Sequence, residues 1–238
     1  MTGSATVRLP REGDHTDFRR QQLIDAAMSS IAEHGLANTT VSRVAEAACL
    51  SQGIMNFYFE SKQALLIATL EYVESEFQRV RRDAKRNAAK TPEAQLDAII
   101  EATFDPAVCN PRYLNVWDAF WGEACAREDF NRVCSTYEIS QRKETIRLFR
   151  KIAEPEQDTD ALGTAFFHLL EARPQTRGRS GRFDIEGIKH TCRAFLATVF
   201  PARFGRSTRR TRRCGSIQRA ITAPEMRDPP PTYEMRHP

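Results

Sequence analysis

An all-α fold is what this sequence of 238 residues predicts. Apolar residues recur at the spacing of a helix through most of the chain. Serine or threonine precedes several of these segments, in position to cap a helix. No alternation of apolar and polar residues is long enough to indicate a strand. The chain is also long enough to bury a large core, and it contains no internal repeat.

The first four predicted helices begin within the N-terminal third. Arg19–His34 carries apolar residues at helical spacing, and Gly35 suits the left-handed position that follows a helix. Each of the next three helices follows a hydroxyl residue that can cap it. The pairs of cap and helix are Thr40 with Val41–Ala48, Ser51 with Gln52–Phe59, and Ser61 with Lys62 to about Asn87.

The remainder of the chain continues as helix, with two exceptions. The predicted helices are Pro92–Phe104, Arg112–Arg127, Asp129–Ala153 and Ile185–Phe200, with half a helix at Thr159–Leu170. The first exception is Phe166–Arg182, which begins as helix and then dissolves into RPQTRGRSGR. The second is Gly205–Pro238, an Arg-rich and then Pro-rich stretch that predicts a disordered tail.

The formal charge of +4 comes from the C-terminal segment of the chain. Residues 201–238 contain nine arginines against three acids, so that the first 200 residues carry a net charge of −2. A basic protein often binds nucleic acid. Here the tail creates the balance, and charge alone is therefore no argument for DNA binding.

Motifs for catalysis and for metal binding are missing from the sequence. It has no Walker loop, G-x-G-x-x-G, G-x-S-x-G or H-E-x-x-H. The six cysteines form no C-x-x-C pair, so we expect reduced core residues, no metal and no cofactor. No apolar run approaches a membrane span, and the N-terminus lacks the apolar core of a secretory signal. We expect a protein of the cytoplasm that is not an enzyme.

The stretch VSRVAEAACLSQGIMNFYFESKQALL, residues 41–66, combines two short helices with a tight turn. Val44 and Ala48 give the first helix an apolar face, and Ile54 and Phe57 are expected to do so for the second. The helix Arg19–His34 would supply the third wall of this small core. Such an arrangement is a helix-turn-helix, whose second helix enters the major groove of DNA.

Polar residues would then occupy the outer face of the second helix. Gln and Asn can pair with adenine and Met can touch a thymine methyl, while glycine lets the backbone approach closely. Tyr58 and Lys62 are expected to contact phosphate, and Phe57 and Phe59 to pack the core. The predicted outer face consists of Gln52, Gly53, Met55, Asn56 and Tyr58. The alternative is a packed helical hairpin with an ordinary polar surface.

The pattern T-V-S-R-V-A-E-A-A-x-L-S-x-G-x-x-x-x-Y-F-x-S-K-x-x-L-L resembles the DNA-binding domain of the TetR family over about residues 19–70. The resemblance implies an all-helical homodimer that binds operator DNA with its N-terminal helices and a small inducer with a larger C-terminal domain. It implies a flexible arm at 1–17, the DNA-binding domain at 18–63 and the ligand-binding and dimerisation domain at 64–204. The implied DNA contacts are Thr40, Ser42, Arg43, Gln52, Gly53, Met55, Asn56, Tyr58 and Lys62.

One position departs from the family pattern. The turn of the motif usually carries glycine where this chain has Cys49. If the backbone there requires a positive φ, a cysteine costs roughly 1 kcal/mol or more.

The C-terminal part resembles a narrower group, the choline-responsive repressors of glycine-betaine synthesis. The stretches that carry this resemblance are FDPAVCNPRYLNVWDAFWGEA, FNRVCSTYEISQR and IKHTCRAFLATVF, at residues 104–124, 130–142 and 188–200. The resemblance implies choline as the inducer and glycine-betaine synthesis genes as the target. Open alternatives are another cationic or hydrophobic inducer, and a helical interaction protein that has lost DNA binding.

Aromatic residues in the first of these stretches suit a cationic ligand. Tyr113, Trp117 and Trp121 are four residues apart and share one helix face. Aromatic faces attract quaternary ammonium groups, although large aromatics at this spacing also suit a core. Nearby carboxylates such as Asp118 would add charge complementarity. The candidate ligand residues are Phe104, Asp105, Tyr113, Trp117, Phe120, Trp121 and Glu123.

The resemblance fails between Thr164 and Phe183, and again beyond Phe204. The family has an apolar dimerisation helix where this chain reads RPQTRGRSGR, either a basic insert or a slipped reading frame. We expect one apolar stripe for the dimer from Ile185–Phe200. The second stripe, Phe166, Phe167, Leu169 and Leu170, would be interrupted at Arg173-Pro174. The sequence therefore predicts a weakened dimer.

Overall fold

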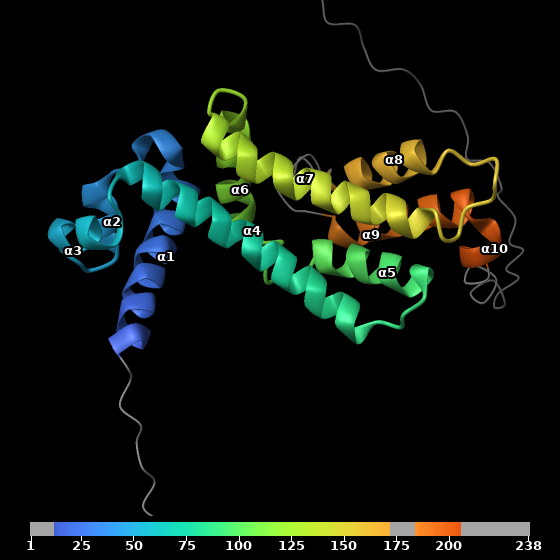
Figure 1. Ribbon diagram of the computed structural model, residues 1–238, viewed down its shortest axis with the longest axis horizontal. Helices are drawn as coiled ribbons and strands as arrows, with labels where there is room; N and C mark the ends of the chain where they lie inside the picture. The colour runs from blue at the N-terminus through green and yellow to red at the C-terminus, as the bar shows by residue number, and fades with distance from the viewer. Residues whose placement is uncertain (1–11, 172–183, 206–238) are drawn as a thin grey trace, which may run out of the picture. The chain divides into compact units, whose positions relative to one another are not determined.

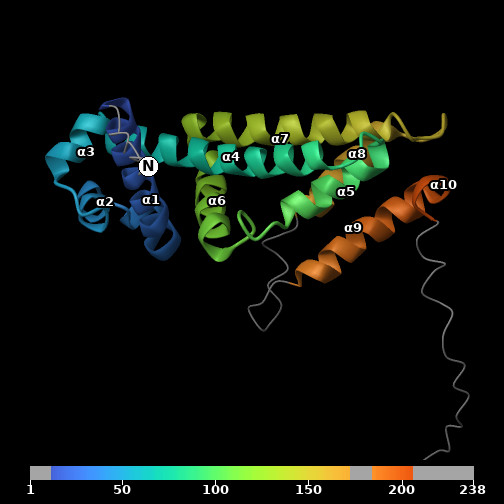
Figure 2. The ribbon, with the colours of Figure 1, turned by 90° about the horizontal axis from the view of Figure 1, so that it is seen from below.

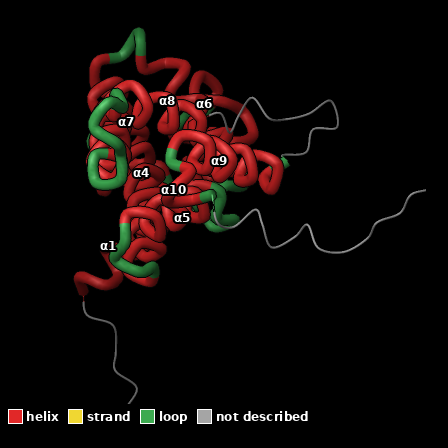
Figure 3. Tube along the Cα trace, turned by 90° about the vertical axis from the view of Figure 1, so that its right-hand side faces the viewer, coloured by secondary structure: helices red, strands yellow, loops and turns green. Residues whose placement is uncertain are grey.

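The computed structural model describes residues 12–171 and 184–205. The predicted arm up to residue 11, the atypical segment 172–183 with Arg173-Pro174, and the predicted tail from 206 lie outside these described residues. Within them every element is a helix, as Figure 3 shows, so the predicted all-α class is confirmed. The bounds are α1 Glu12–Asn38, α2 Val41–Ala47, α3 Gln52–Tyr58, α4 Lys62–Asn87, α5 Pro92–Thr103, α6 Pro111–Ala124, α7 Glu128–Phe149, α8 Thr159–Glu171, α9 Ile185–Val199 and α10 Pro201–Phe204.

Three hydroxyl caps set the starts of α2, α3 and α4 as the sequence predicts. Thr40 Oγ1 accepts from the amide of Arg43 at 3.2 Å, and Ser51 Oγ from that of Ile54 at 3.3 Å. Ser61 Oγ accepts from the amide of Ala64 at 3.0 Å. Each side chain satisfies an amide that the first turn of a helix leaves without a backbone partner.

The first helix differs from the prediction at both ends. It begins at Glu12 rather than Arg19, so residues 12–17 of the predicted arm are helical. Gly35 has a φ of 77°, the left-handed conformation expected of a residue that ends a helix. A further helical turn, residues 36–38, then follows the kink.

Three apolar clusters form the core of the described chain. The first joins α1, α2, α3 and the start of α4, which Figure 1 shows gathered at one end of α4. The second lies among α1, α4, α6 and α7. The third lies among α5, α7, α8 and α9. Because α1 packs against both α4 and α6, the helix-turn-helix is joined directly to the helices that would carry the ligand site.

Helices α4 and α7 run side by side in the same direction, as Figure 2 shows. Gln63 at the start of α4 hydrogen-bonds to Asp129 at the start of α7. Further along, the rings of Phe77 and Tyr137 lie 6.2 Å apart, and Arg81 then pairs with Glu144. We refer to the contact between these two helices, from Phe77 to Lys85 and from Tyr137 to Glu144, as the α4–α7 seam.

Helix α8 crosses α7 at very short range. A Cβ atom on Gly163 would lie 2.7 Å from Cγ1 of Ile146 and 3.0 Å from its Cα. Glycine therefore lets the two backbones meet at this point.

The apolar stripes expected to form a dimer lie largely inside the chain instead. Phe166, Phe167 and Leu170 of α8 are buried in the described structure. On α9, Ile188, Cys192 and Leu196 are buried as well. These buried residues fill the space between α5, α7, α8 and α9, so the prediction that they face a second subunit is wrong for them. The other apolar residues of the predicted stripes are only partly buried, namely Leu169, Ile185, Phe195 and Val199.

Candidate DNA-binding surface and ligand site

A polar surface extends over the outer sides of α2 and α3. Gln52, Gly53 and Asn56 of α3 are exposed, and Tyr58 is half-buried. Gln52 Nε2 donates to Ser42 Oγ, which joins the exposed sides of the two helices. Thr40 and Arg43 are exposed beside them, so most of the predicted contact residues share one surface.

Two of these side chains also hold the backbone of α1. Arg43 Nη1 donates to the carbonyl oxygen of Asn38. Lys62 Nζ lies 3.5 Å from the carbonyl oxygen of Leu36. Arginine and lysine near the end of a helix satisfy its last carbonyl groups, so both residues have a structural role beside any contact with phosphate.

The predicted faces of α3 are wrong at three positions, Ile54, Met55 and Phe57. Met55 is fully buried and packs in the first core cluster, so it cannot be one of the exposed contact residues. Phe57, predicted to be in the core, is 80% exposed. Ile54, also predicted to be in the core, is 39% exposed, and Met55 and Phe59 form the buried pair one helical turn apart instead.

Phe57 is a surface residue that the sequence interpretation missed. Its ring contacts that of Tyr58 edge to face, with centroids 5.1 Å apart. An exposed phenylalanine on a recognition helix can contact a thymine methyl group. The sequence could have indicated this, because Met55 and Phe59 are four residues apart and share one helix face. If that face is buried, Phe57 points outward.

Cys49 has the positive φ that its place in the turn predicts. Its φ is 52°, and it is the one non-glycine residue with a positive φ among the described residues. The amide of Leu50 donates to the carbonyl oxygen of Ala45 at 2.9 Å, which closes the turn at the end of α2.

An aromatic cluster lies where α4, α6 and α7 meet. Its members are Phe77, Tyr113, Trp117, Trp121 and Tyr137. The ring of Trp117 lies 5.0 Å from that of Tyr137 and 5.6 Å from that of Phe77. Trp121 stacks on Trp117 at 5.9 Å and is 43% exposed, so one end of the cluster reaches the surface.

Tyr113 occupies the other side of this cluster. Its ring lies 6.3 Å from that of Phe77. Burial raises the pKa of the Tyr113 phenol, and its hydrogen bond with Tyr72 acts in the same direction. The phenol therefore stays neutral and contributes polarity without charge.

The other predicted ligand residues lie elsewhere. Phe104 is buried in the third core cluster, and Phe120 packs edge to face on Phe130 at 4.9 Å. The Asp105 carboxylate accepts from the amide of Ala107 at 2.8 Å within a turn. Glu123 is exposed near the end of α6. Phe77 and Tyr137 were missed, because contacts between separate helices leave no spacing signal within either one.

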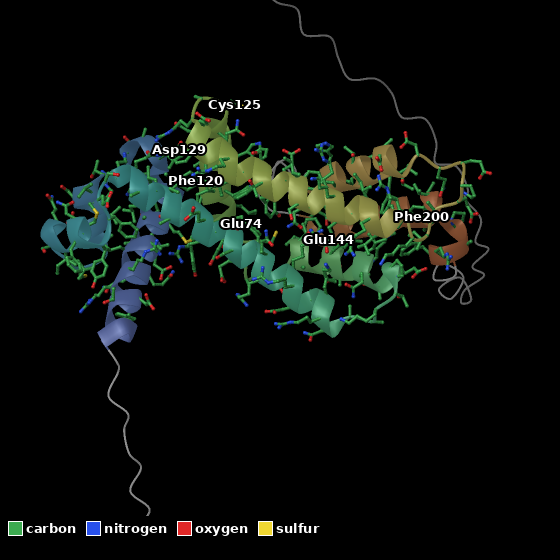
Figure 4. All side chains as sticks on the ribbon, viewed as in Figure 1. Glu74, Phe120, Cys125, Asp129, Glu144 and Phe200 are labelled. Carbon is green, nitrogen blue, oxygen red and sulfur yellow. The ribbon has the colours of Figure 1, made fainter. Side chains whose placement is uncertain are left out.

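A polar group adjoins the aromatic cluster along the α4–α7 seam. Arg81 Nε lies 3.1 Å from Glu144 Oε2, and Lys85 Nζ contacts the other oxygen of that carboxylate. Gln141 is buried and its Oε1 has no hydrogen-bond partner. In Figure 4, Glu144 lies farther from α2 and α3 than Phe120 does.

The described residues contain neither a cluster of metal-binding side chains nor a helix suited to a membrane. Across residues 12–171 and 184–205, no three His, Cys, Asp or Glu side chains gather as a metal site would require. Nor does this part of the chain contain a helix with the length and apolar character needed to cross a bilayer.

Two family models match this chain. Bacterial regulatory proteins, tetR family, match residues 23–69, and the C-terminal model of the BetI-type transcriptional repressors matches residues 92–201. The chain belongs to the TetR family. Both models describe regulators rather than enzymes, in agreement with the sequence prediction.

Curated relatives of this TetR-family chain match about half of it. An HTH-type transcriptional regulator BetI of Paraburkholderia xenovorans is 35% identical over 117 residues, which cover 49% of this chain and 60% of that protein. A protein of the same description from Burkholderia ambifaria is 38% identical over 108 residues, 45% of this chain and 56% of that one. The matched region thus spans less than two thirds of these relatives.

Solved structures agree on the fold. A TetR transcription regulator from Haloarcula marismortui superimposes with a TM-score of 0.68, at 18% identity, over 77% of this chain and 98% of that one. A transcriptional regulator from Saccharomonospora viridis in complex with choline gives a TM-score of 0.64, also at 18% identity, over 76% of this chain and 96% of that one. At these identities the comparison supports the fold alone.

Proposed function

We propose that the protein is a transcriptional repressor that binds operator DNA as a dimer and is released by choline, and that it controls genes of glycine-betaine synthesis. The exposed polar surface of α3 is the observation that carries DNA binding. Its buried side, Met55 and Phe59, anchors the helix in the first core cluster. Its outer side presents Gln52 and Asn56 to solvent. A recognition helix needs both properties.

On this surface Gln52 and Asn56 are the base-reading residues. Gln52 Nε2 is held by Ser42, which leaves Gln52 Oε1 to accept from the exocyclic amine of adenine or cytosine. Asn56, one helical turn on, is exposed and free to pair with adenine. Tyr58, Arg43 and Lys62 border this region and contact phosphate.

The aromatic cluster is the ligand site in this proposal. The quaternary ammonium of choline binds between Trp117, Trp121 and Tyr137, whose ring faces attract a cation. The rings contact one another directly, so the ligand enters by separating them at the exposed Trp121 end. Gln141 Oε1, one turn beyond Tyr137, offers the choline hydroxyl a buried acceptor. The choline-bound structure from Saccharomonospora viridis supports a ligand of this kind for the fold.

Helix α6 connects the proposed ligand site to the DNA-binding helices. It carries Trp117, and it also carries two side chains that hold α1. Arg112 Nη2 donates to the carbonyl oxygen of Asp25 at 2.8 Å, and Asn115 Nδ2 to that of Ala32 at 3.4 Å. A ligand that shifts α6 therefore shifts α1, and with it the angle at which α3 meets DNA.

A gel shift with the promoter region next to this gene tests the proposal. We expect the wild-type protein to bind it and choline to release it. Trp117→Leu keeps apolar bulk and removes the aromatic face, so we expect roughly tenfold weaker choline binding with DNA binding intact. Phe149→Leu, a buried aromatic in the third core cluster, is the matched control and should leave the choline response unchanged.

The outcomes separate the competing functions. Binding of DNA without release by choline would leave a repressor with a different inducer. Absence of DNA binding by a folded protein would favour a helical interaction protein and overturn the proposal. Equal loss of the choline response in both variants would return Trp117 to a purely structural role.

A further inference from the structure

Two apolar side chains form a strip on the outer side of α3. Phe57 is 80% exposed, more than any other large apolar residue in the part of the chain that the structure describes, and Ile54 is 39% exposed. The two residues are three positions apart, so they are neighbours on the surface of the helix. The apolar area of this strip is not removed from water by the fold, and it stays available to a partner.

Phe57 occupies the centre of this outer side. The buried Met55 marks the direction of the core. Residues two positions before and two positions after it lie about 160° from it around the helix axis. These residues are Gly53 and Phe57, whereas Asn56 lies on a flank. The ring of Phe57 therefore projects where a recognition helix faces the base edges in the major groove.

Gly53 leaves open space one helical turn before this ring. A Cβ at Gly53 would meet only Ser51 Oγ, at 3.7 Å, which is an ordinary contact. The φ of Gly53 is not positive either, so neither packing nor backbone conformation requires glycine there. Glycine is a poor helix former, and its place on this face lets an outside group approach the backbone closely.

Tyr58 restricts the exposed ring. The rings of Phe57 and Tyr58 meet edge to face, with centroids 5.1 Å apart and planes at 88°. This is a favourable arrangement for two aromatic rings. Because Tyr58 is itself half-buried, the contact holds the Phe57 ring against the helix. A side chain that is already restricted loses less entropy when it binds.

We propose that Phe57 packs on the 5-methyl group of a thymine in the operator and is a specificity-determining residue of the DNA-binding surface. The inference rests on the proposed function and adds an apolar contact to the polar base contacts of Gln52 and Asn56. The thymine methyl is the apolar group that base pairs present in the major groove. A phenyl ring has no donor or acceptor for a phosphate or a polar base edge, so covering this methyl is the contact that its chemistry favours.

Deoxyuridine tests the inference, because it lacks the 5-methyl group and keeps the hydrogen-bonding edge of thymine. Two versions of the promoter fragment next to this gene, one made with thymidine and one with deoxyuridine, are titrated with the full-length protein by fluorescence anisotropy. We expect wild-type protein to bind the deoxyuridine fragment about fourfold more weakly for each methyl group that is covered. Phe57→Ala should weaken binding to the thymidine fragment by at least this factor and bind both fragments equally.

Two further variants serve as controls. Phe18→Ala removes a second exposed phenylalanine, which lies on α1 and is 63% exposed, and it should keep both the affinity and the preference for thymidine. Phe57→Leu keeps an apolar side chain of similar reach and should keep most of the preference. Since Phe57 and Phe18 are both exposed, none of these substitutions empties the core.

The outcomes separate this inference from the proposed function. If wild-type protein binds both fragments equally, or if Phe57→Ala keeps the preference for thymidine, the inference is overturned and the repressor stands. If folded wild-type protein binds neither fragment, the proposed function fails and the inference fails with it.

Discussion

Cys49 is the residue at which chemistry and backbone geometry conflict most clearly. The turn between α2 and α3 imposes a φ of 52°, a conformation that costs a residue with a Cβ roughly 1–2 kcal/mol. This conflict could be predicted from sequence, because the family pattern has glycine at the position. The sequence could not show that the turn between α2 and α3 keeps its positive φ despite this backbone strain.

Replacing Cys49 with glycine should stabilise the protein. The relief of backbone strain exceeds the greater entropy that glycine adds to the unfolded chain, so we expect a gain of about 0.5–1 kcal/mol. Urea unfolding followed by circular dichroism would measure it. Cys49→Ala keeps the Cβ and removes only the sulfur, so it should give no such gain. A similar gain from alanine would place the cost on the thiol rather than on the backbone.

At the scale of elements, helix ends were more predictable than helix faces. Thr40, Ser51 and Ser61 fixed the starts of three helices, because a cap is a local interaction between neighbours in sequence. The faces of α3 were not resolved correctly, because seven residues make only two turns and two registers fit nearly equally well. Met55 and Phe57 exchanged their predicted places for this reason.

The ligand site was predictable only where one helix supplied it. The spacing of Tyr113, Trp117 and Trp121 placed them on one face of α6. Phe77 and Tyr137 complete the cluster from α4 and α7, and their approach depends on how three helices pack. Arg81 and Glu144 likewise lie 63 positions apart in sequence, a separation over which no periodic pattern operates.

Variants of α3 and α4 should separate base reading from phosphate contact. Asn56→Ala is expected to cost about 1–3 kcal/mol on the operator, with little effect on random DNA. Lys62→Ala should weaken both and lower the slope of log K against log salt by about 1 per half-site. Fluorescence anisotropy at several salt concentrations gives both values. An unchanged slope would limit Lys62 to its bond with the Leu36 carbonyl, and equal losses on both DNAs would contradict base reading by Asn56.

At the scale of the whole molecule, the exposed surfaces of α8 and α9 combine small residues with charged ones such as Asp160 and Arg193. Most of the apolar residues of α8 and α9 are buried in the core of the chain itself. The exposed positions on these two helices include Ala161, Ala165 and His168 on α8, with Thr191, Ala194 and Thr198 on α9. Small side chains allow close helix contact but bury little apolar area each. This favours a dimer that dissociates readily.

Sedimentation velocity would measure the strength of this dimer. We expect monomer and dimer to exchange at micromolar concentration, and Ala194→Arg to leave only monomer because it places a charge in the contact. Ala107→Arg, an exposed substitution in the turn before α6, serves as the control and should not alter the equilibrium. A tight dimer that persists with Ala194→Arg would show that another surface joins the subunits.

The close contact at Gly163 restricts which residues can replace this glycine. A Cβ there would clash with Ile146 Cγ1 at 2.7 Å and press on its Cα at 3.0 Å, so even alanine requires α8 or Ile146 to shift. A displaced α8 would carry Phe166 out of its stacked contact with Phe195 of α9. A single missing methyl group therefore sets the spacing of three helices. Among related sequences, glycine at this position identifies those that can share this helix crossing, whatever their overall similarity.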